Sequence, residues 1–171
     1  YSAEVQDTCT IINKVYAEIG TKKNINFALG VPAAGLLPVA KLNKALMHAI
    51  RSLDGGTDYG LIQGNEKLRR QIARGSFTWG GKLDEDDVVS TAGCMNALSF
   101  CLLSLTQRGD TIVVESPVYF GLLQLAQSLG LNVIELPTNP TTGVEIDALK
   151  KEKKKKKIKL CLLISNFNNP L

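Results

Sequence analysis

The second half of the chain alternates between apolar runs of strand length and apolar runs of helix length. This alternation limits the possible folds more than any other feature of the sequence. It predicts four strands and three helices between residues 87 and 165. The predicted strands cover residues 87–91, 111–115, 132–137 and 159–165, and the predicted helices cover 94–105, 119–130 and a lysine-rich segment with Asp147 as its candidate N-cap. Strands and helices at this spacing are typical of right-handed βαβ units in a parallel sheet, and the fourth strand is apolar enough for burial on both faces.

The first part of the chain has a different pattern, with helices separated by turn-rich segments. We expect helices near residues 3–19, from Pro38 to about residue 51, and from an N-cap at Asn65 to about residue 78. His48 falls in the second of these helices and is interpreted as a surface residue. Residues 1–80 are therefore predicted to form an arm and flanking helices, and residues 81–171 a βαβ sheet core, both within one partial domain.

The composition is that of a globular domain, with 171 residues of which 44% are hydrophobic and 21% charged. The formal net charge of +4 comes from one place, because residues 150–159 contain eight lysines and one glutamate. No aromatic residue lies within this lysine run, which argues against a nucleic-acid site. A solvated helix face or loop is the expected role of the run.

The four cysteines, at positions 9, 94, 101 and 161, contain no CxxC pair, and the single histidine has no cysteine at metal-ligand spacing. A structural zinc site and a disulfide framework are therefore not expected. Cys101 and Cys161 lie in apolar runs and are predicted to be core residues, which favours a reducing, cytoplasmic compartment. No apolar run reaches the length of a membrane span, and Tyr1 is not followed by an export signal.

In a parallel sheet, ligands bind beyond the carboxyl ends of the strands, so the segments that follow the predicted strands are candidate site segments. In the first, TAGCMNAL, Gly93 is followed at once by a helix whose first N–H groups, from Cys94 and Met95, could bind a phosphate. The alternative is an ordinary tight turn between strand and helix. The segment has neither a GxGxxG motif nor a Walker lysine, which argues against a dinucleotide or nucleoside triphosphate.

Two later segments add candidate residues. Pro117 stiffens the turn after the second strand and places Tyr119 where its ring could lie against a flat ligand, although ordinary packing explains it equally well. Near the end of the chain, the Asn169 amide could donate to an anionic oxygen or could form an Asx turn before Pro170.

Four segments in this order, DYGLIQGNEKLR, TAGCMNAL, GDTIVVESPVYFG and NNP, resemble the class I/II aminotransferases of pyridoxal-phosphate (PLP) fold type I over nearly the whole chain. The stretch VVESPVYFGLLQLAQSLGLNVIELPTNPTTGVEIDAL is similar to the aminotransferase-like domain of MocR-type GntR transcriptional regulators. In such regulators a winged helix-turn-helix precedes this domain. The resemblance implies an α/β fold, the N-terminal part of the large PLP-binding domain, with a mostly parallel sheet and flanking helices.

The resemblance also implies roles for individual residues. Gly93 would make the turn at which the backbone N–H groups of Cys94 and Met95 bind the PLP phosphate. Tyr119 would stack on the pyridine ring, and Asn169 would donate a hydrogen bond to the ring's phenolic oxygen.

Two further roles are implied in the first part of the chain. Tyr59 would reach the phosphate of the neighbouring subunit, which implies a homodimer, and Gly30 would lie near the substrate carboxylate. The family's Schiff-base lysine, pyridinium aspartate and carboxylate-binding arginine would follow Leu171, so the 171-residue segment alone is expected to have no transaminase activity. The solvated lysine run cannot replace a lysine that must be desolvated and aimed.

Three functions follow as hypotheses. The first is a PLP-binding domain of a MocR/GntR-type regulator that senses an amine or amino acid and reaches DNA only through an N-terminal domain that this sequence does not contain. The second is a PLP-dependent aminotransferase acting on amino acids and 2-oxo acids. The third is a nucleotide-binding Rossmann-like module without PLP.

Overall fold

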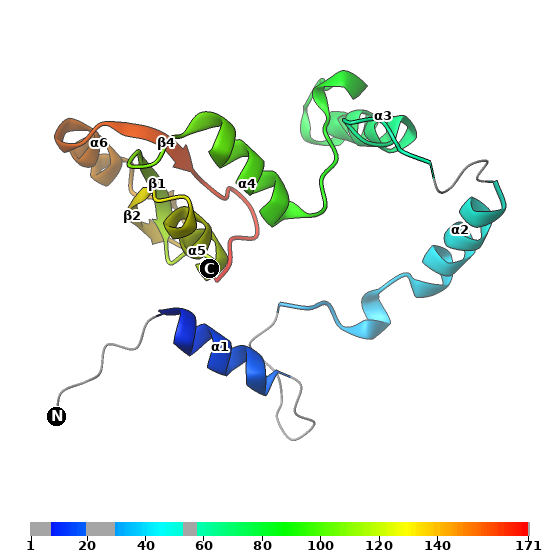
Figure 1. The fold of residues 1–171 in the computed structure, drawn as a ribbon, viewed down its shortest axis with the longest axis horizontal. Coiled ribbons are helices and arrows are strands. Elements are labelled where there is room, and N and C mark those ends of the chain that lie inside the picture. Colours follow the sequence, from blue (N-terminus) through cyan, green and yellow to red (C-terminus); the bar gives the residue numbers. More distant parts are fainter. Residues whose placement is uncertain (1–7, 20–29, 53–57, 171) are drawn as a thin grey trace. The chain divides into compact units, whose positions relative to one another are not determined.

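The computed structural model describes residues 8–19, 30–52 and 58–170, which form two compact units, Tyr1–Gly60 and Leu61–Leu171 (Figure 1). The first unit contains α1 (Thr8–Glu18), η1 (Ala34–Leu36) and α2 (Val39–Ser52). The predicted helix start near residue 3 lies outside the described residues. Helix α2 begins at Val39, one residue after the predicted start at Pro38, and the Pro38 carbonyl accepts a hydrogen bond from the Leu42 N–H at 3.0 Å. His48 is exposed on α2, which confirms its interpretation as a surface residue.

The second unit holds the sheet and the helices around it. Its elements are α3 (Glu66–Ser76), η2 (Phe77–Trp79), η3 (Glu85–Asp87), α4 (Cys94–Leu105), β1 (Thr111–Ser116), α5 (Phe120–Ser128), β2 (Asn132–Asn139), β3 (Gly143–Val144), α6 (Ile146–Lys155) and β4 (Ile158–Leu162) (Figure 1). The strand order is β3-β2-β1-β4, with β1 parallel to both β2 and β4 and β3 antiparallel to β2. The predicted α/β fold with a mostly parallel sheet is confirmed.

The short antiparallel strand β3 was not predicted. It forms because the chain reverses directly after β2, where the Asn139 side-chain oxygen accepts hydrogen bonds from the N–H groups of Thr141 and Thr142 at 2.8 and 3.2 Å. This Asx-type turn brings Gly143 and Val144 back alongside the end of β2.

The core lies between β1 and the helices α4 and α5. Ile112 and Val114 of β1 are fully buried and pack with Leu102 of α4 and with Leu122 and Ala126 of α5. Successive side chains of a strand point to opposite faces of the sheet, so Val113 and Glu115 face away from these helices. Helix α6 contacts β2.

Helix α3 is joined to the segment before α4 by two arginines. Arg69 is buried, and its guanidinium donates to the Glu85 backbone carbonyl at 2.6 Å and contacts the Asp86 carboxylate at 3.3 Å. The Arg70 guanidinium donates to the Glu85 carboxylate at 2.6 Å, and this hydrogen bond lowers the pKa of Glu85 below its ordinary value. The predicted N-cap is confirmed, since the Asn65 side chain accepts from the Leu68 N–H at 3.1 Å.

The prediction of a strand over residues 87–91 is wrong. Asp87 ends the 3-10 helix η3, and residues 88–91 form no strand, although Val88 has an extended backbone. The Ser90 N–H donates instead to the Gln63 carbonyl at 2.9 Å. An apolar run becomes a strand only when a neighbouring strand shares its hydrogen bonds, and no described strand lies beside this run.

The predictions for β4 and for two cysteines are also wrong. β4 is the last strand of the described sheet, and Lys159 and Cys161 are exposed, so the strand is not buried on both faces. Cys101 is exposed too, because the adjacent Leu102 takes the core position on α4. These cysteines therefore carry no information about the compartment.

The lysine run begins within α6 and is exposed, as predicted. The N-cap of α6 is Glu145 and not the predicted Asp147. Asp147 lies within the first turn of the helix and forms an ion pair there with Lys150 at 3.0 Å. Lys155 donates to Glu152 at 2.8 Å, and this hydrogen bond lowers the pKa of Glu152.

Candidate functional site

An apolar cleft of about 390 Å³ lies at the carboxyl ends of β1 and β4. Its walls come from the start of α4, the segment that joins β1 to α5, and the end of β4. The lining residues are Cys94, Met95, Leu98, Val118, Tyr119, Leu122, Leu162, Leu163 and Ile164. This is the edge of a parallel sheet at which ligands generally bind. We call this space the apolar cleft.

The N-terminus of α4 opens onto the apolar cleft. Gly93, the N-cap, has φ 118° and ψ 168°, a conformation that L side chains rarely adopt, and a Cβ placed there would meet no heavy atom within 4 Å. The Asn96 side chain accepts from the Ala92 N–H at 3.2 Å and so stabilises the turn before the helix. The N–H groups of Cys94 and Met95 belong to the first turn, where no helical carbonyl is available to them. The positive end of the helix dipole and these donors together suit a phosphate.

The apolar cleft is also lined by Tyr119. Tyr119 is the N-cap residue of α5 and is half-buried, and its carbonyl accepts from the Leu122 N–H at 3.0 Å. The ring folds back over Gly121, where an added Cβ would lie 2.4 Å from the Tyr119 Cε1 atom. The Phe120 ring lies beside it, with centroids 4.6 Å apart. Gly121, whose lack of a Cβ leaves room for the Tyr119 ring, was not singled out from the sequence.

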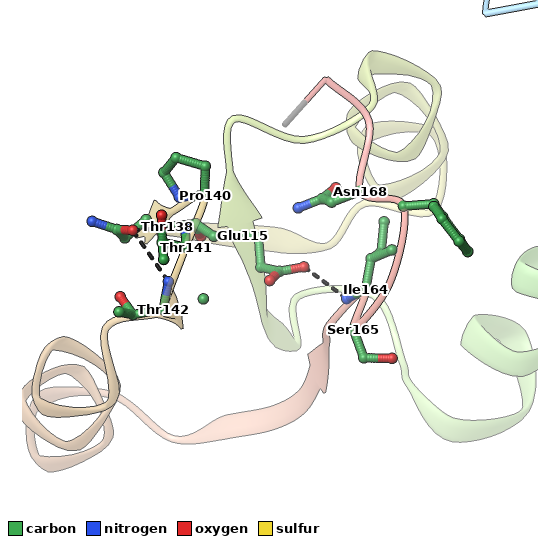
Figure 2. Close-up of a pocket in the computed structure, with 11 residues that line it drawn as sticks. Glu115, Thr138, Pro140, Thr141, Thr142, Ile164, Ser165 and Asn168 are labelled. Carbon is green, nitrogen blue, oxygen red and sulfur yellow. Dashed lines mark hydrogen bonds between the residues drawn. The ribbon is translucent and has the colours of Figure 1, made fainter. Parts of the chain in front are cut away.

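A second, polar cleft of about 340 Å³ lies between β1, the turn after β2 and the segment that follows β4 (Figure 2). Glu115 of β1 is only 5% exposed and accepts a hydrogen bond from the Ile164 N–H at 2.7 Å (Figure 2). Asn168 also lines this polar cleft, and its side-chain oxygen is buried and has no hydrogen-bond partner among the described residues. Sequence reasoning missed both residues; the only signal was a charged residue near the end of an otherwise apolar strand.

The structure brings together some of the predicted site residues. Cys94, Met95 and Tyr119 line the apolar cleft, and Gly93 directly precedes them. Asn169 is exposed and lines neither cleft, whereas its neighbour Asn168 lines the polar cleft.

The other two predicted residues, Gly30 and Tyr59, are exposed and belong to the first unit. Their predicted roles, and that of Asn169, stay predictions. Within the described residues, no group of three or more His, Cys, Asp or Glu side chains could hold a metal ion. The described helices include none of the length and apolarity that a membrane span requires.

Known proteins resemble this chain in sequence. The family model for aminotransferase class I and II matches residues 22–171. The uncharacterized HTH-type transcriptional regulator YjiR of Escherichia coli K12 is 37% identical over 142 residues, which is 82% of this chain and 30% of that protein. Aromatic-amino-acid aminotransferase 1 of Thermococcus litoralis is 28% identical over 170 residues, 93% of this chain and 40% of the enzyme. The chain thus spans between about a third and two fifths of the length of these relatives.

Solved structures agree with these matches. The α-aminoadipate aminotransferase LysN of Thermus thermophilus, solved in complex with N-(5'-phosphopyridoxyl)-L-leucine, superposes with a TM-score of 0.76 at 25% identity, over 96% of this chain and 43% of that one. An archaeal alanine:glyoxylate aminotransferase gives a TM-score of 0.81 at 24% identity, over 95% of this chain and 42% of that one, which supports the fold. Because the family model matches residues 22–171, which is most of the chain, the chain belongs to the class I and II aminotransferase family.

Proposed function

We propose that this chain is the PLP-binding, aminotransferase-like part of a MocR/GntR-type transcriptional regulator that senses an amine or amino acid in the cytoplasm. The observation that carries the proposal is the apolar cleft, in which the N-terminus of α4 and the Tyr119 ring share one space. The similarity to two HTH-type regulators, 37% and 32% identical to this chain, supports the regulator over the enzyme. The protein would bind DNA through a separate N-terminal domain.

The residues that line the apolar cleft fit PLP. The N–H groups of Cys94 and Met95 would bind the phosphate dianion, and the space in front of Gly93 leaves room for its oxygens. The Tyr119 ring offers an aromatic face to the pyridine, while Leu162 and other aliphatic side chains exclude water. When bound, PLP supplies an aldehyde that reacts reversibly with primary amines. This chain would bind and orient the cofactor.

The remaining predicted residues complete the proposal. Asn169 would donate to the phenolic oxygen of PLP, and Gly30 would lie near the carboxylate of an amino-acid ligand. Tyr59 would serve the site of the neighbouring subunit in a homodimer.

The second candidate is a PLP-dependent aminotransferase acting on amino acids and 2-oxo acids. The similarity to the Thermococcus litoralis aromatic-amino-acid aminotransferase over 93% of this chain favours it. The family assignment leaves the nucleotide-binding alternative without support.

One set of measurements on the full-length protein separates these functions. We expect a PLP absorbance band, binding to DNA from its own promoter region, and a change in DNA affinity when PLP and an amino acid are present together. The measurements are absorbance titration, fluorescence anisotropy with labelled DNA, and an assay for 2-oxo acid formation. Absence of the PLP band would overturn the proposal, and rapid transamination without DNA binding would favour the enzyme.

Tyr119 should depend on Gly121 for its position. We expect Gly121→Ala to lower PLP affinity by about 1 kcal/mol, roughly fivefold, because the added Cβ displaces the ring from the face that would contact the pyridine. The measurement is PLP titration followed by absorbance. The matched control is Gly75→Ala on α3, where an added Cβ meets nothing within 4 Å, and its PLP affinity should equal that of the wild type. Equal affinity in both variants would show that the ring position does not matter.

The predicted role of Tyr59 has its own test. We expect the full-length protein to be a homodimer and Tyr59→Phe to weaken PLP binding by about 1 kcal/mol, through the loss of one hydrogen bond to the phosphate of the partner site. Analytical ultracentrifugation and PLP titration are the measurements. A monomer whose PLP affinity is unchanged by Tyr59→Phe would contradict this role.

A further inference from the structure

The polar cleft contains a buried acidic group without a basic neighbour among its described lining residues. Glu115 is 5% exposed, and the one hydrogen bond to its carboxylate within the described chain comes from the neutral Ile164 N–H at 2.7 Å. None of the described residues that line the polar cleft is a lysine, arginine or histidine. Burying a carboxylate is costly unless a cation or several hydrogen-bond donors compensate the lost hydration. Here a single backbone donor is present, so the carboxylate is only partly compensated.

A second acceptor in the polar cleft is also unsatisfied. The Asn168 side-chain oxygen is buried and has no hydrogen-bond partner in the described parts of the chain. Asn168 and Glu115 both line the same cleft, and Figure 2 shows both side chains next to Ile164. A carboxylate and an orphan amide oxygen in one space call for a cationic ligand with more than one hydrogen-bond donor, from N–H or O–H groups.

The polar cleft is separate from the proposed PLP site. Glu115 follows Val114, which packs into the core under α4 and α5, so the alternation of the strand directs Glu115 to the other face of the sheet. The two clefts share only Ile164 among their described lining residues. A ligand in the polar cleft would therefore not occupy the space proposed for the cofactor.

The donor set favours an organic cation over a metal ion. One carboxylate with neutral oxygens falls short of the ligand sets that zinc or calcium requires, and no cluster of three metal-ligating side chains occurs in the described parts of the chain. Threonine and serine residues also line this cleft, and Thr141, Thr142 and Ser165 give it a polar lining that suits a small amino alcohol or diamine. The volume of about 340 Å³ is sufficient for such a molecule.

We propose that the polar cleft binds a small organic ammonium cation, with the Glu115 carboxylate as its counter-ion and the Asn168 side-chain oxygen as its second acceptor. This site goes beyond the proposed PLP function and does not depend on it.

The experiment is a ligand-detected NMR titration of the full-length protein with N,N-dimethylethanolamine. This tertiary amine carries one N–H when protonated and cannot condense with the aldehyde of PLP. Its neutral isostere, 3-methylbutan-1-ol, has the same shape without the charge. We expect the amine to bind and the alcohol to bind at least about tenfold more weakly, because hydrogen bonds to charged groups are the strong ones. Equal binding of the two probes, or no binding of the amine, would overturn the proposal; the latter is also the result if a lysine or arginine from elsewhere in the protein fills the cleft.

Variants locate the site. Glu115→Gln keeps an oxygen for the Ile164 N–H and should weaken the amine about tenfold or more. The matched control is Glu135→Gln on β2, an exposed glutamate outside the polar cleft, which should leave the affinity unchanged. Asn168→Asp adds a second carboxylate and should strengthen binding, so it tests the site even if Glu115→Gln proves unstable in thermal unfolding. Unchanged affinity in Asn168→Asp, or equal affinity in the two glutamine variants, would overturn the assignment.

Discussion

Leu102→Ala is expected to lower the free energy of unfolding by about 3 kcal/mol, the typical cost of a large cavity in a closed core. Leu102 is 1% exposed and packs with Ile112, Val114 and Leu122, so no solvent or flexible side chain is available to fill the space. The measurement is urea unfolding of the purified protein, monitored by circular dichroism, with the midpoint and slope compared between wild type and variant.

Leu103→Ala is the matched control. Leu103 is the next residue of α4, so the substitution removes the same atoms, but the Leu103 side chain is 60% exposed. Its effect should stay within about 0.5 kcal/mol, as for most surface substitutions. Similar losses at both positions would contradict the assignment of the core-facing side of α4.

The elements that sequence reasoning predicted well are those whose signal is local. The apolar period over Cys94–Leu105 and the β-branched run that starts at Thr111 determine a helix and a strand almost without regard to the rest of the chain. The order of these elements then predicts the parallel pairing of β1 with its neighbours, because crossover connections have a fixed hand.

The wrong predictions, a strand over residues 87–91 and burial of β4 on both faces, have a different cause. Strand pairing and burial depend on which segments lie nearby in space. The run after Asp87 has the composition of a strand, but among the described residues its Ser90 N–H finds a loop carbonyl and not a neighbouring strand. β4 is apolar enough to be central, yet it is the last strand of the described sheet, and its Cys161 is exposed. An apolar composition allows a segment to be a buried strand, but the segments that pack against it determine whether it pairs and which of its faces is buried.

The candidate site divides in the same way. Cys94, Met95 and Tyr119 follow from a general rule, because residues just beyond the carboxyl ends of parallel strands meet at one edge. Glu115 could not be found by that rule. Its place in the polar cleft depends on a hydrogen bond from Ile164, a residue 49 positions later in the chain, and on the turn that Asn139 makes after β2.

The test of the proposed phosphate site is Cys94→Pro. We expect it to lower PLP affinity about tenfold to a hundredfold, because it removes one N–H donor to a dianion and hydrogen bonds to charged groups contribute about 1.5–3 kcal/mol. Cys94 is the first residue of α4, where proline is well tolerated, and the ψ of 168° at Gly93 lies outside the α region that a following proline disfavours. Proline at Met95, one residue later, would instead push Cys94 out of its helical conformation. PLP titration and thermal unfolding of the full-length protein are the two measurements.

Cys94→Ala is the control that separates the backbone from the side chain. Alanine keeps the N–H and the helix but removes the thiol, so its PLP affinity should match that of the wild type. A loss of affinity in Cys94→Pro alone, with unfolding temperatures that agree among the three proteins, would locate the phosphate at the N-terminus of α4. Equal losses in both variants would assign the effect to the thiol, and unchanged affinity in Cys94→Pro would mean that the phosphate binds elsewhere. Competition by inorganic phosphate tests the phosphate contact independently of the pyridine ring. Phosphate should compete with PLP for binding to the wild type and to Cys94→Ala. It should compete more weakly in Cys94→Pro, because the missing N–H donor faces the phosphate and not the pyridine.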